Sequence, residues 1–138
     1  MPKFGRRSLN NLSSCHKDLQ EIMYEAIKYY DFSVLEGHRS VERQLMLYTE
    51  GKSKIDGVKK KGKHNYMPSL AVDVVPYPVD WEDSNRFHFL AGLIFGIAER
   101  LREEGKIEHR VRWGGDWDKD MDFQDQTFND YPHFELYK

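Results

Sequence analysis

The chain has 138 residues, 32% of them charged, and a formal net charge of -2. This balance excludes the strong positive charge that would favour binding to nucleic acid or to an anionic membrane. The length predicts a single domain over residues 1–138, with Cys15 as its only cysteine and hence no internal disulfide. No apolar run follows the basic N-terminus, and no segment is apolar enough to span a bilayer, so neither a signal peptide nor membrane insertion is expected.

The first half of the chain alternates between helical and extended patterns. Residues 13–30 place apolar side chains at three- and four-residue steps, which predicts an amphipathic helix with Ser14 as its N-cap. Residues 32–37 are a short β-branched and aromatic run that predicts a strand. Helical spacing returns over residues 40–51. The segment 52–63 carries six lysines and little apolar content, so we expect a mobile loop there.

The second half predicts three strands and the longest helix. Residues 69–78 indicate a core strand that ends at two prolines, because proline cannot donate to a sheet ladder. Residues 84–105 are apolar along one side and end in glycine, which predicts a helix. Two more strands are expected over 109–114 and 132–137. The whole pattern predicts an α+β fold with a small antiparallel sheet and about three helices.

The six histidines differ in their sequence context. His64 lies shortly before a predicted strand that contains Asp73, and His133 opens the last strand with Asp130 three residues earlier. A carboxylate within a run of valines is costly to bury without a partner, and a cation is a suitable partner. The other four histidines are expected either at the surface or in the core with hydrogen-bond partners for their ring nitrogens: His16, His38, His88 and His109.

Two neutral imidazoles and one carboxylate are a ligand set that zinc accepts, with a fourth position left for water. A second carboxylate outside the metal shell is needed to accept the proton of the attacking water and to hand it to the leaving amine. Asp130 is the candidate for this base. Spacing alone does not decide between such a site and three residues that never meet in the fold.

Four motifs resemble the M15 family of zinc peptidases: "GHRSVERQ", "GKHNYMPSLAVDVVPY", "RWGGDW" and "DYPHFEL". Their order is that of phage endolysins that act as L-alanyl-D-glutamate peptidases on bacterial peptidoglycan. The resemblance implies a hedgehog/D-Ala-D-Ala peptidase-like fold. It also implies one catalytic Zn2+ ion bound by His64, Asp73 and His133, with Asp130 as the catalytic base.

The resemblance extends to residues around the metal ligands. Arg39, in the "G-x-R-S" motif, and Gln44 resemble residues that line the substrate cleft, and a guanidinium fork suits the carboxylates of stem peptides. A surface ion pair with Glu36 or Glu42 is the alternative for Arg39. Asp116, in "GGDW", resembles a position close to the metal that orients a ligand or closes the cleft.

The first metal-binding motif departs from the usual family pattern. Nine residue steps separate His64 from Asp73, where the family usually has seven, and a turn around Pro68 replaces the family's glycine. Gly62 stands where serine is common. We expect Ser69 to supply the polar contact of that serine on the substrate side.

The aspartates at 116, 118, 120 and 122 raise the question of a calcium loop. An EF-hand loop needs glycine at its sixth position and glutamate at its twelfth, but Met121 and Thr127 occupy these positions. An EF-hand is therefore excluded. A looser calcium or accessory zinc site and a solvated acidic loop are the two alternatives for residues 118–125.

The sequence leaves more than one role open for Glu135 and for the lysine-rich segment 52–63. Strand alternation puts Glu135 on the same face as His133, which predicts that Glu135 supports the ligand histidine, unless it is an edge carboxylate that faces water. The lysine-rich segment 52–63 is expected to form a cleft rim that engages the anionic cell wall. A salt-sensitive nucleic-acid patch and a solvated loop without a partner are its alternatives.

The sequence therefore predicts a zinc metallopeptidase that cleaves peptidoglycan stem peptides between L-alanine and D-glutamate. A D-alanyl-D-alanine carboxypeptidase or dipeptidase and a non-catalytic zinc-containing cell-wall binder are the alternatives. We expect one catalytic domain with no separate cell-wall-binding domain, acting as a monomer without a nucleic-acid partner. The expected location is the host bacterial cytoplasm until a phage holin releases the enzyme to the cell wall.

Overall fold

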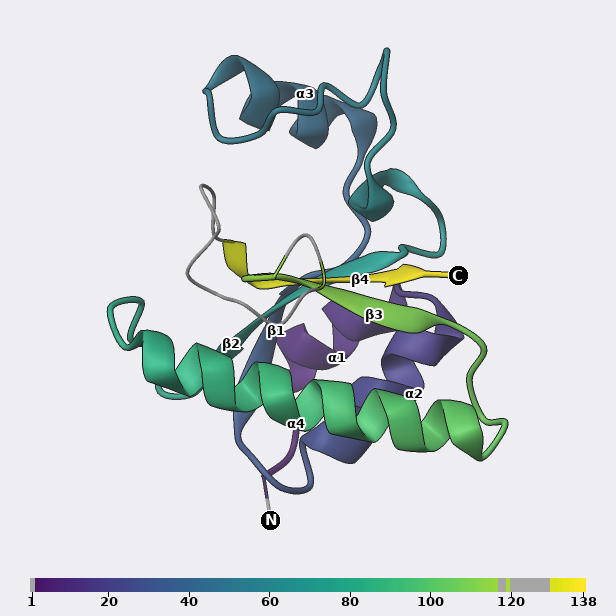
Figure 1. The fold of residues 1–138 in the computed structure, drawn as a ribbon. Helices are drawn as coiled ribbons and strands as arrows, with labels where there is room; N and C mark the ends of the chain where they lie inside the picture. Colours follow the sequence, from purple (N-terminus) through teal and green to yellow (C-terminus); the bar gives the residue numbers. More distant parts are fainter. Residues whose placement is uncertain (1, 117–118, 120–129) are drawn as a thin grey trace.

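The computed structural model describes residues 2–116, 119 and 130–138. Four strands form one antiparallel sheet in the order β1-β2-β4-β3 (Figure 1). The strands are β1 (Phe32–Glu36), β2 (Ala71–Pro76), β3 (Arg110–Gly114) and β4 (Asp130–Tyr137). The helices are α1 (Arg6–Ser13), α2 (Lys17–Ala26), α3 (Val41–Thr49) and α4 (Ser84–Glu103), with a short 3-10 helix η1 (Lys63–Asn65). The predicted α+β class with a small antiparallel sheet is confirmed.

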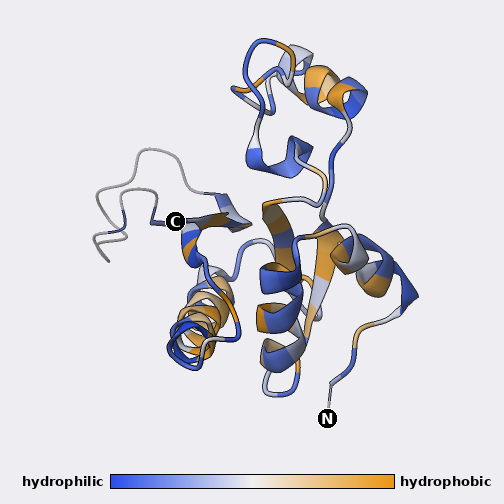
Figure 2. Ribbon diagram, turned by 90° about the vertical axis from the view of Figure 1, so that its right-hand side faces the viewer, coloured by the Kyte–Doolittle hydropathy of each residue, from blue (hydrophilic) through white to orange (hydrophobic). Residues whose placement is uncertain are grey.

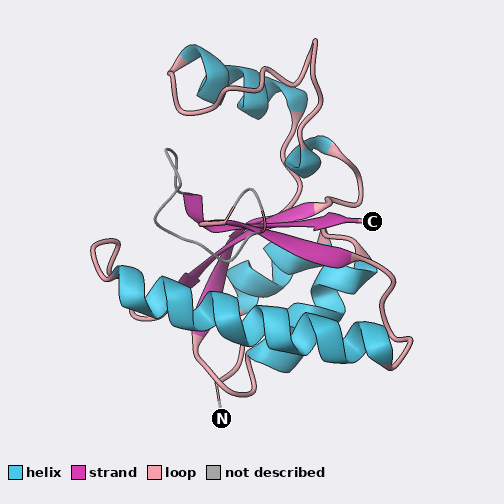
Figure 3. Ribbon diagram, viewed as in Figure 1, coloured by secondary structure: helices cyan, strands magenta, loops and turns pink. Residues whose placement is uncertain are grey.

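One face of the sheet forms the hydrophobic core. Val72 pairs with Phe134, which pairs in turn with Trp113, and all three are buried. Helices α1, α2 and α4 cover this face (Figures 1 and 3). Helix α4 buries apolar side chains at three- and four-residue steps, and Figure 2 shows it nearly end-on with its hydrophobic residues gathered on one side.

The opposite face of the sheet is polar. Antiparallel pairing places Glu36 opposite Asp73, Asp73 opposite His133, and Arg112 opposite Glu135. Directly opposed residues in an antiparallel pair point to the same face, so these five side chains share one surface. Helix α3 and the segment that leads to η1 lie over this side (Figure 1). The sheet thus separates an apolar core from a charged site.

Helix α1 was not predicted from the sequence. Leu9 and Leu12 are the only apolar residues among its eight, and it buries only Ser8 and Leu12, so the sequence offers too few apolar positions to indicate a helix. Polar contacts hold it to β1 instead: the backbone N–H of Val34 donates to Ser8 Oγ at 3.0 Å, and Asn11 Nδ2 donates to the Val34 carbonyl at 2.9 Å.

The N-cap predicted for α2 is corrected by the structure. Ser14 follows α1 as its C-cap, and α2 begins at Lys17 with His16 as its N-cap. The Nδ1 atom of His16 accepts a hydrogen bond from the backbone N–H of Asp18 at 3.0 Å. An imidazole nitrogen therefore takes the role expected of a serine hydroxyl.

Two glycines allow the close approaches that position the polar face. A Cβ atom at Gly114 would clash with the carbonyl oxygen of Asp130, where β3 meets the irregular start of β4. A Cβ atom at Gly37 would clash with the Asn11 carbonyl at the end of α1. Any residue other than glycine at these two positions would force the backbone to move.

Within the described residues, none of the helices is both long enough and apolar enough to cross a membrane.

Candidate active site

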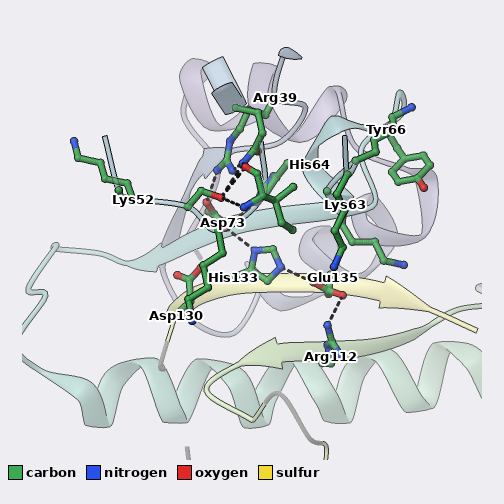
Figure 4. A pocket seen from close by; sticks show the side chains of 18 residues that line it. Arg39, Lys52, Lys63, His64, Tyr66, Asp73, Arg112, Asp130, His133 and Glu135 are labelled. Atoms are coloured by element: carbon green, nitrogen blue, oxygen red, sulfur yellow. Dashed lines mark hydrogen bonds and ion pairs between the residues drawn. The ribbon is translucent and has the colours of Figure 1, made fainter. Parts of the chain in front are cut away.

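A cavity of about 470 Å3 opens on the polar face of the sheet. His64, Asp73, Asp130, His133 and Glu135 line it on the sheet side. Arg39, Gln44 and lysines of the segment 52–63 line the remaining wall (Figure 4). The cavity therefore combines an acidic and histidine-rich floor with a basic rim.

The predicted metal ligands meet in this cavity. Asp73 Oδ1 lies 3.2 Å from His64 Nε2 and 3.3 Å from His133 Nδ1. One potential ligand atom from each residue falls within 4.8 Å of the others. The three residues come from η1, β2 and β4, and the Asp73–His133 pair is set directly by the antiparallel register.

Outer contacts fix which ring nitrogen of each histidine faces the site. His64 Nδ1 is 2.7 Å from the Gly37 carbonyl, which can only accept, so Nδ1 donates there and Nε2 is the nitrogen that faces Asp73. His133 Nε2 donates to Glu135 Oε1 at 2.8 Å, which leaves Nδ1 to face Asp73. Ligand histidines in metalloproteins have this arrangement, in which the second nitrogen donates to a carbonyl or a carboxylate.

The electrostatics of the three residues favour a cation between them. Burial works to raise the pKa of Asp73, but hydrogen bonds from His133 and His64 outweigh it and hold this pKa well below its usual range. Burial works to lower the pKa of His133, but hydrogen bonds to Asp73 and Glu135 raise it to about 9. The proton on His133 thus supplies the positive charge that the Asp73 carboxylate needs nearby. A metal ion bound by the same three residues could supply this charge instead.

Asp130 lies at the start of β4 and lines the same cavity, on the far side of His133 from Glu135 in Figure 4. Burial and the nearby charge of Asp73 raise the pKa of Asp130 above its ordinary value, although His133, His64 and Arg39 oppose the rise. A carboxyl group with a raised pKa is better matched to proton transfer near neutral pH than an ordinary aspartate.

Arg39 lines the cavity. Its guanidinium fork is bound to Glu36, with Nε to Oε1 and Nη2 to Oε2 both at 2.9 Å, and Nη1 donates to Gln44 Oε1 at 3.0 Å. Nη2 also lies 3.6 Å from Asp73 Oδ2. The fork therefore forms the ion pair with Glu36 that was the alternative, and the guanidinium also lies against Asp73. Contact of Arg39 with the substrate stays a prediction.

Gln44 is buried in the cavity wall and connects α3 to the lysine-rich segment. Its Nε2 donates to Ser53 Oγ at 2.8 Å and to the Ile55 carbonyl at 2.7 Å. Because these groups and Arg39 use both ends of the amide, the structure gives Gln44 a role in holding the rim.

Ser69 does not contact the cavity, contrary to the prediction. Its side chain is fully buried, and its Oγ donates to the Ala71 carbonyl at 2.6 Å at the start of β2. No surface of Ser69 is left for a substrate. Asp116 is also buried, in the turn after β3, and it is not among the cavity-lining residues, so its role near the metal stays a prediction. Residues 118–125, apart from Lys119, lie outside the described residues.

We expect Glu135→Gln to lower metal affinity roughly 10- to 100-fold, because Glu135 is buried and holds His133 while Arg112 Nη2 pairs with its Oε2 at 3.1 Å. Glutamine can still accept from His133 but brings no charge. Zinc affinity measured by competition with a chelating dye checks this result. Glu42→Gln, on the exposed side of α3, is the matched control, and equal affinities for the two variants would contradict the assignment.

Two histidines and a carboxylate around one space, beside a separate carboxylate with a raised pKa, define a metal-dependent hydrolase. Residues 1–137 match the family described as phage L-alanyl-D-glutamate peptidase. The chain belongs to this family. It also resembles the crystal structure of Serratia marcescens L-Ala D-Glu endopeptidase ChiX, with a TM-score of 0.73 and 32% identity over 98% of this chain and 90% of that chain. The predicted enzyme class, a peptidoglycan endopeptidase, is confirmed.

Proposed function

We propose that this enzyme hydrolyses the L-alanyl-D-glutamate bond of peptidoglycan stem peptides and that it needs a zinc ion held by His64, Asp73 and His133. The observation that carries the proposal is the convergence of one ring nitrogen from each of two histidines on the Asp73 carboxylate, within one cavity that also contains Asp130. Nitrogen and oxygen donors in this number suit zinc better than magnesium or calcium. Bound zinc would supply Lewis acidity toward the scissile carbonyl and the attacking water.

The protein residues perform the remaining work. Asp130 accepts the proton of the attacking water and then delivers it to the departing amine, which its raised pKa favours. Glu135 and the Gly37 carbonyl hold the two histidines in the tautomers that face the substrate. Arg39 helps to hold Asp73 in place through the 3.6 Å contact between Nη2 and Oδ2.

Mass spectrometry of digested peptidoglycan tests the bond that is cleaved. We expect new peptides that begin with D-glutamate and glycan strands that end in L-alanine. Loss of a terminal D-alanine without a new D-glutamate amino terminus would instead identify a carboxypeptidase. Peptidoglycan that stays uncleaved in the presence of zinc would identify a non-catalytic binder.

The basic rim provides a site for substrate carboxylates, since the guanidinium of Arg39 is engaged by Glu36. Five of the six lysines in the segment 52–63 line the cavity. Lys60 and Lys61 are exposed on this rim, and Lys61 Nζ lies 4.3 Å from the ring centre of Tyr66. A D-glutamate residue keeps one free carboxylate after the other forms a peptide bond. We propose that the rim lysines attract this charge.

We expect the double change Lys60→Glu and Lys61→Glu to lower kcat/KM about tenfold at low ionic strength, with a smaller loss at high salt. Lys59→Glu is the matched control, because Lys59 belongs to the same segment but does not line the cavity. Steady-state kinetics at two salt concentrations check the result. The rim has no such role if both variants lose activity equally.

We further propose that the enzyme serves phage release as an endolysin. In this proposal it gathers in the host cytoplasm as a monomer and reaches the cell wall when a holin opens the membrane. Expression in the host with and without a holin tests this: lysis should require both proteins, and lysis by the enzyme alone would contradict it.

A further inference from the structure

A second group of metal-binding residues lies apart from the active-site cavity. His16 is the N-cap of α2, Asp18 lies in the first turn of this helix, and His109 directly precedes β3. None of the three lines the active-site cavity. One potential ligand atom from each falls within 4.8 Å of the others.

Asp18 is the centre of this group. It is 1% exposed, and its Oδ2 accepts three hydrogen bonds: from Glu108 N at 3.1 Å, His109 N at 3.2 Å and His109 Nδ1 at 2.8 Å. Its Oδ1 is buried without a hydrogen-bond partner. His16 Nδ1 lies 4.0 Å from Oδ1, which is too far for a hydrogen bond.

A buried carboxylate oxygen without a partner is unfavourable, and a bound cation removes the cost. Burial works to raise the pKa of Asp18, but the hydrogen bonds from His109 and Glu108 lower it, so the group is an anion at neutral pH. The buried, unpartnered Oδ1 therefore favours binding of a cation more strongly than an ordinary surface aspartate would.

Both imidazoles can supply a ligand nitrogen. His16 Nδ1 accepts a hydrogen bond from Asp18 N, so this atom is unprotonated, and a bound cation would take the lone pair in exchange for that hydrogen bond. The His109 proton on Nδ1 can move to Nε2 through solvent, which frees Nδ1. The two rings meet edge to face with centroids 4.9 Å apart, and both side chains are partly exposed, which leaves an approach for an ion and a water.

We propose that His16, Asp18 and His109 form a second metal site, structural in role, for a divalent transition metal of the zinc class. Two imidazoles and one carboxylate select this class over calcium and magnesium. Ligand atoms about 3.4 Å apart surround a tetrahedral zinc ion, so rotation of the two imidazoles completes the site. The ion ties the start of α2 to the start of β3, which lie 91 residues apart in the sequence.

Zinc binding to the intact chain, after removal of metal by a chelator, tests the proposal. Zinc alone is added, and the bound metal per chain and the melting temperature are measured. The wild-type chain should bind about two ions. The double variant His64→Ala and His133→Ala, which lacks the catalytic ligands, should keep about one ion and still melt at a higher temperature with zinc.

His16→Asn is the informative change, because asparagine also accepts a hydrogen bond at an N-cap and preserves the start of α2. In the double-variant background it should abolish zinc binding and the rise in melting temperature. His38→Asn in the same background should leave both unchanged. In the otherwise wild-type chain, His16→Asn should reduce the bound zinc from two ions to one and leave the hydrolysis rate intact.

Two results would overturn the proposal: a double variant that binds no zinc, or one that keeps its ion after His16 and His109 are both replaced. Because the hydrolysis rate is measured separately, failure of this proposal is distinguishable from failure of the catalytic assignment.

Discussion

Replacement of Asp130 by asparagine is expected to leave zinc binding intact and to lower kcat roughly 100- to 10,000-fold. Asparagine has nearly the same shape but cannot accept the proton of the attacking water. Asp130 does not need to bind the metal for this role, so the bound zinc per chain should stay at the wild-type level. Hydrolysis of purified peptidoglycan and metal content, measured on the same preparation, check both parts.

The pH profile sharpens this prediction. A base works only in its deprotonated form, so the wild-type rate should fall as the pH drops through the raised pKa of Asp130. This acid limb should lie above the pH at which an ordinary aspartate titrates, and it should be lost in Asp130→Asn. A variant with an unchanged rate and an unchanged acid limb would remove Asp130 from the mechanism.

Replacement of His64 by alanine is expected to abolish hydrolysis and to weaken zinc binding at the catalytic site. The change removes one of three protein ligands and also leaves the Gly37 carbonyl without its imidazole donor. The structural consequence should be local, because His64 lies in a three-residue 3-10 helix outside the hydrophobic core.

His38→Gln is the control for this change, since His38 lies beside Gly37 but does not line the cavity. Circular dichroism should give the wild-type spectrum for both variants, and only His64→Ala should lose activity. Substantial hydrolysis by His64→Ala with zinc bound as in the wild type would contradict its place as a ligand.

The order of the motifs is what allows a ligand set to be predicted from the sequence, and the structure brings the three predicted residues together. The structure adds the reason why the ligands meet: β2 and β4 pair antiparallel, and this register sets Asp73 opposite His133. Neither the strand order nor the register follows from local patterns, since both depend on contacts between segments that are distant in the sequence. The predicted support of His133 by Glu135 agrees with their 2.8 Å contact, and its effect on metal binding awaits measurement.

The environment of Arg39 shows where local reasoning reaches its limit. Its sequence context offers a substrate carboxylate, Glu36 and Glu42 as partners of similar chemistry. Glu36 lies at the end of β1 opposite Asp73, which brings its carboxylate onto the polar face and into reach of the guanidinium. The pairing of β1 with β2 therefore decides which carboxylate Arg39 pairs with.

The histidines of the second proposed metal site illustrate the same limit. His16 and His109 were expected to be surface or satisfied core residues because each stands alone in its own segment. The fold brings both to one buried carboxylate, and only the structure reveals the unpartnered oxygen of Asp18. Sequence spacing carries no signal for a cluster of this kind.

Hydrolysis by demonstrably metal-free enzyme is the most direct test of the central claim. The enzyme is stripped with a chelator, its metal content is measured, and peptidoglycan hydrolysis is followed before and after zinc is returned. We expect no new D-glutamate amino termini from the metal-free enzyme and recovery of cleavage with zinc. Cleavage at the wild-type rate by enzyme shown to contain no metal would contradict the account.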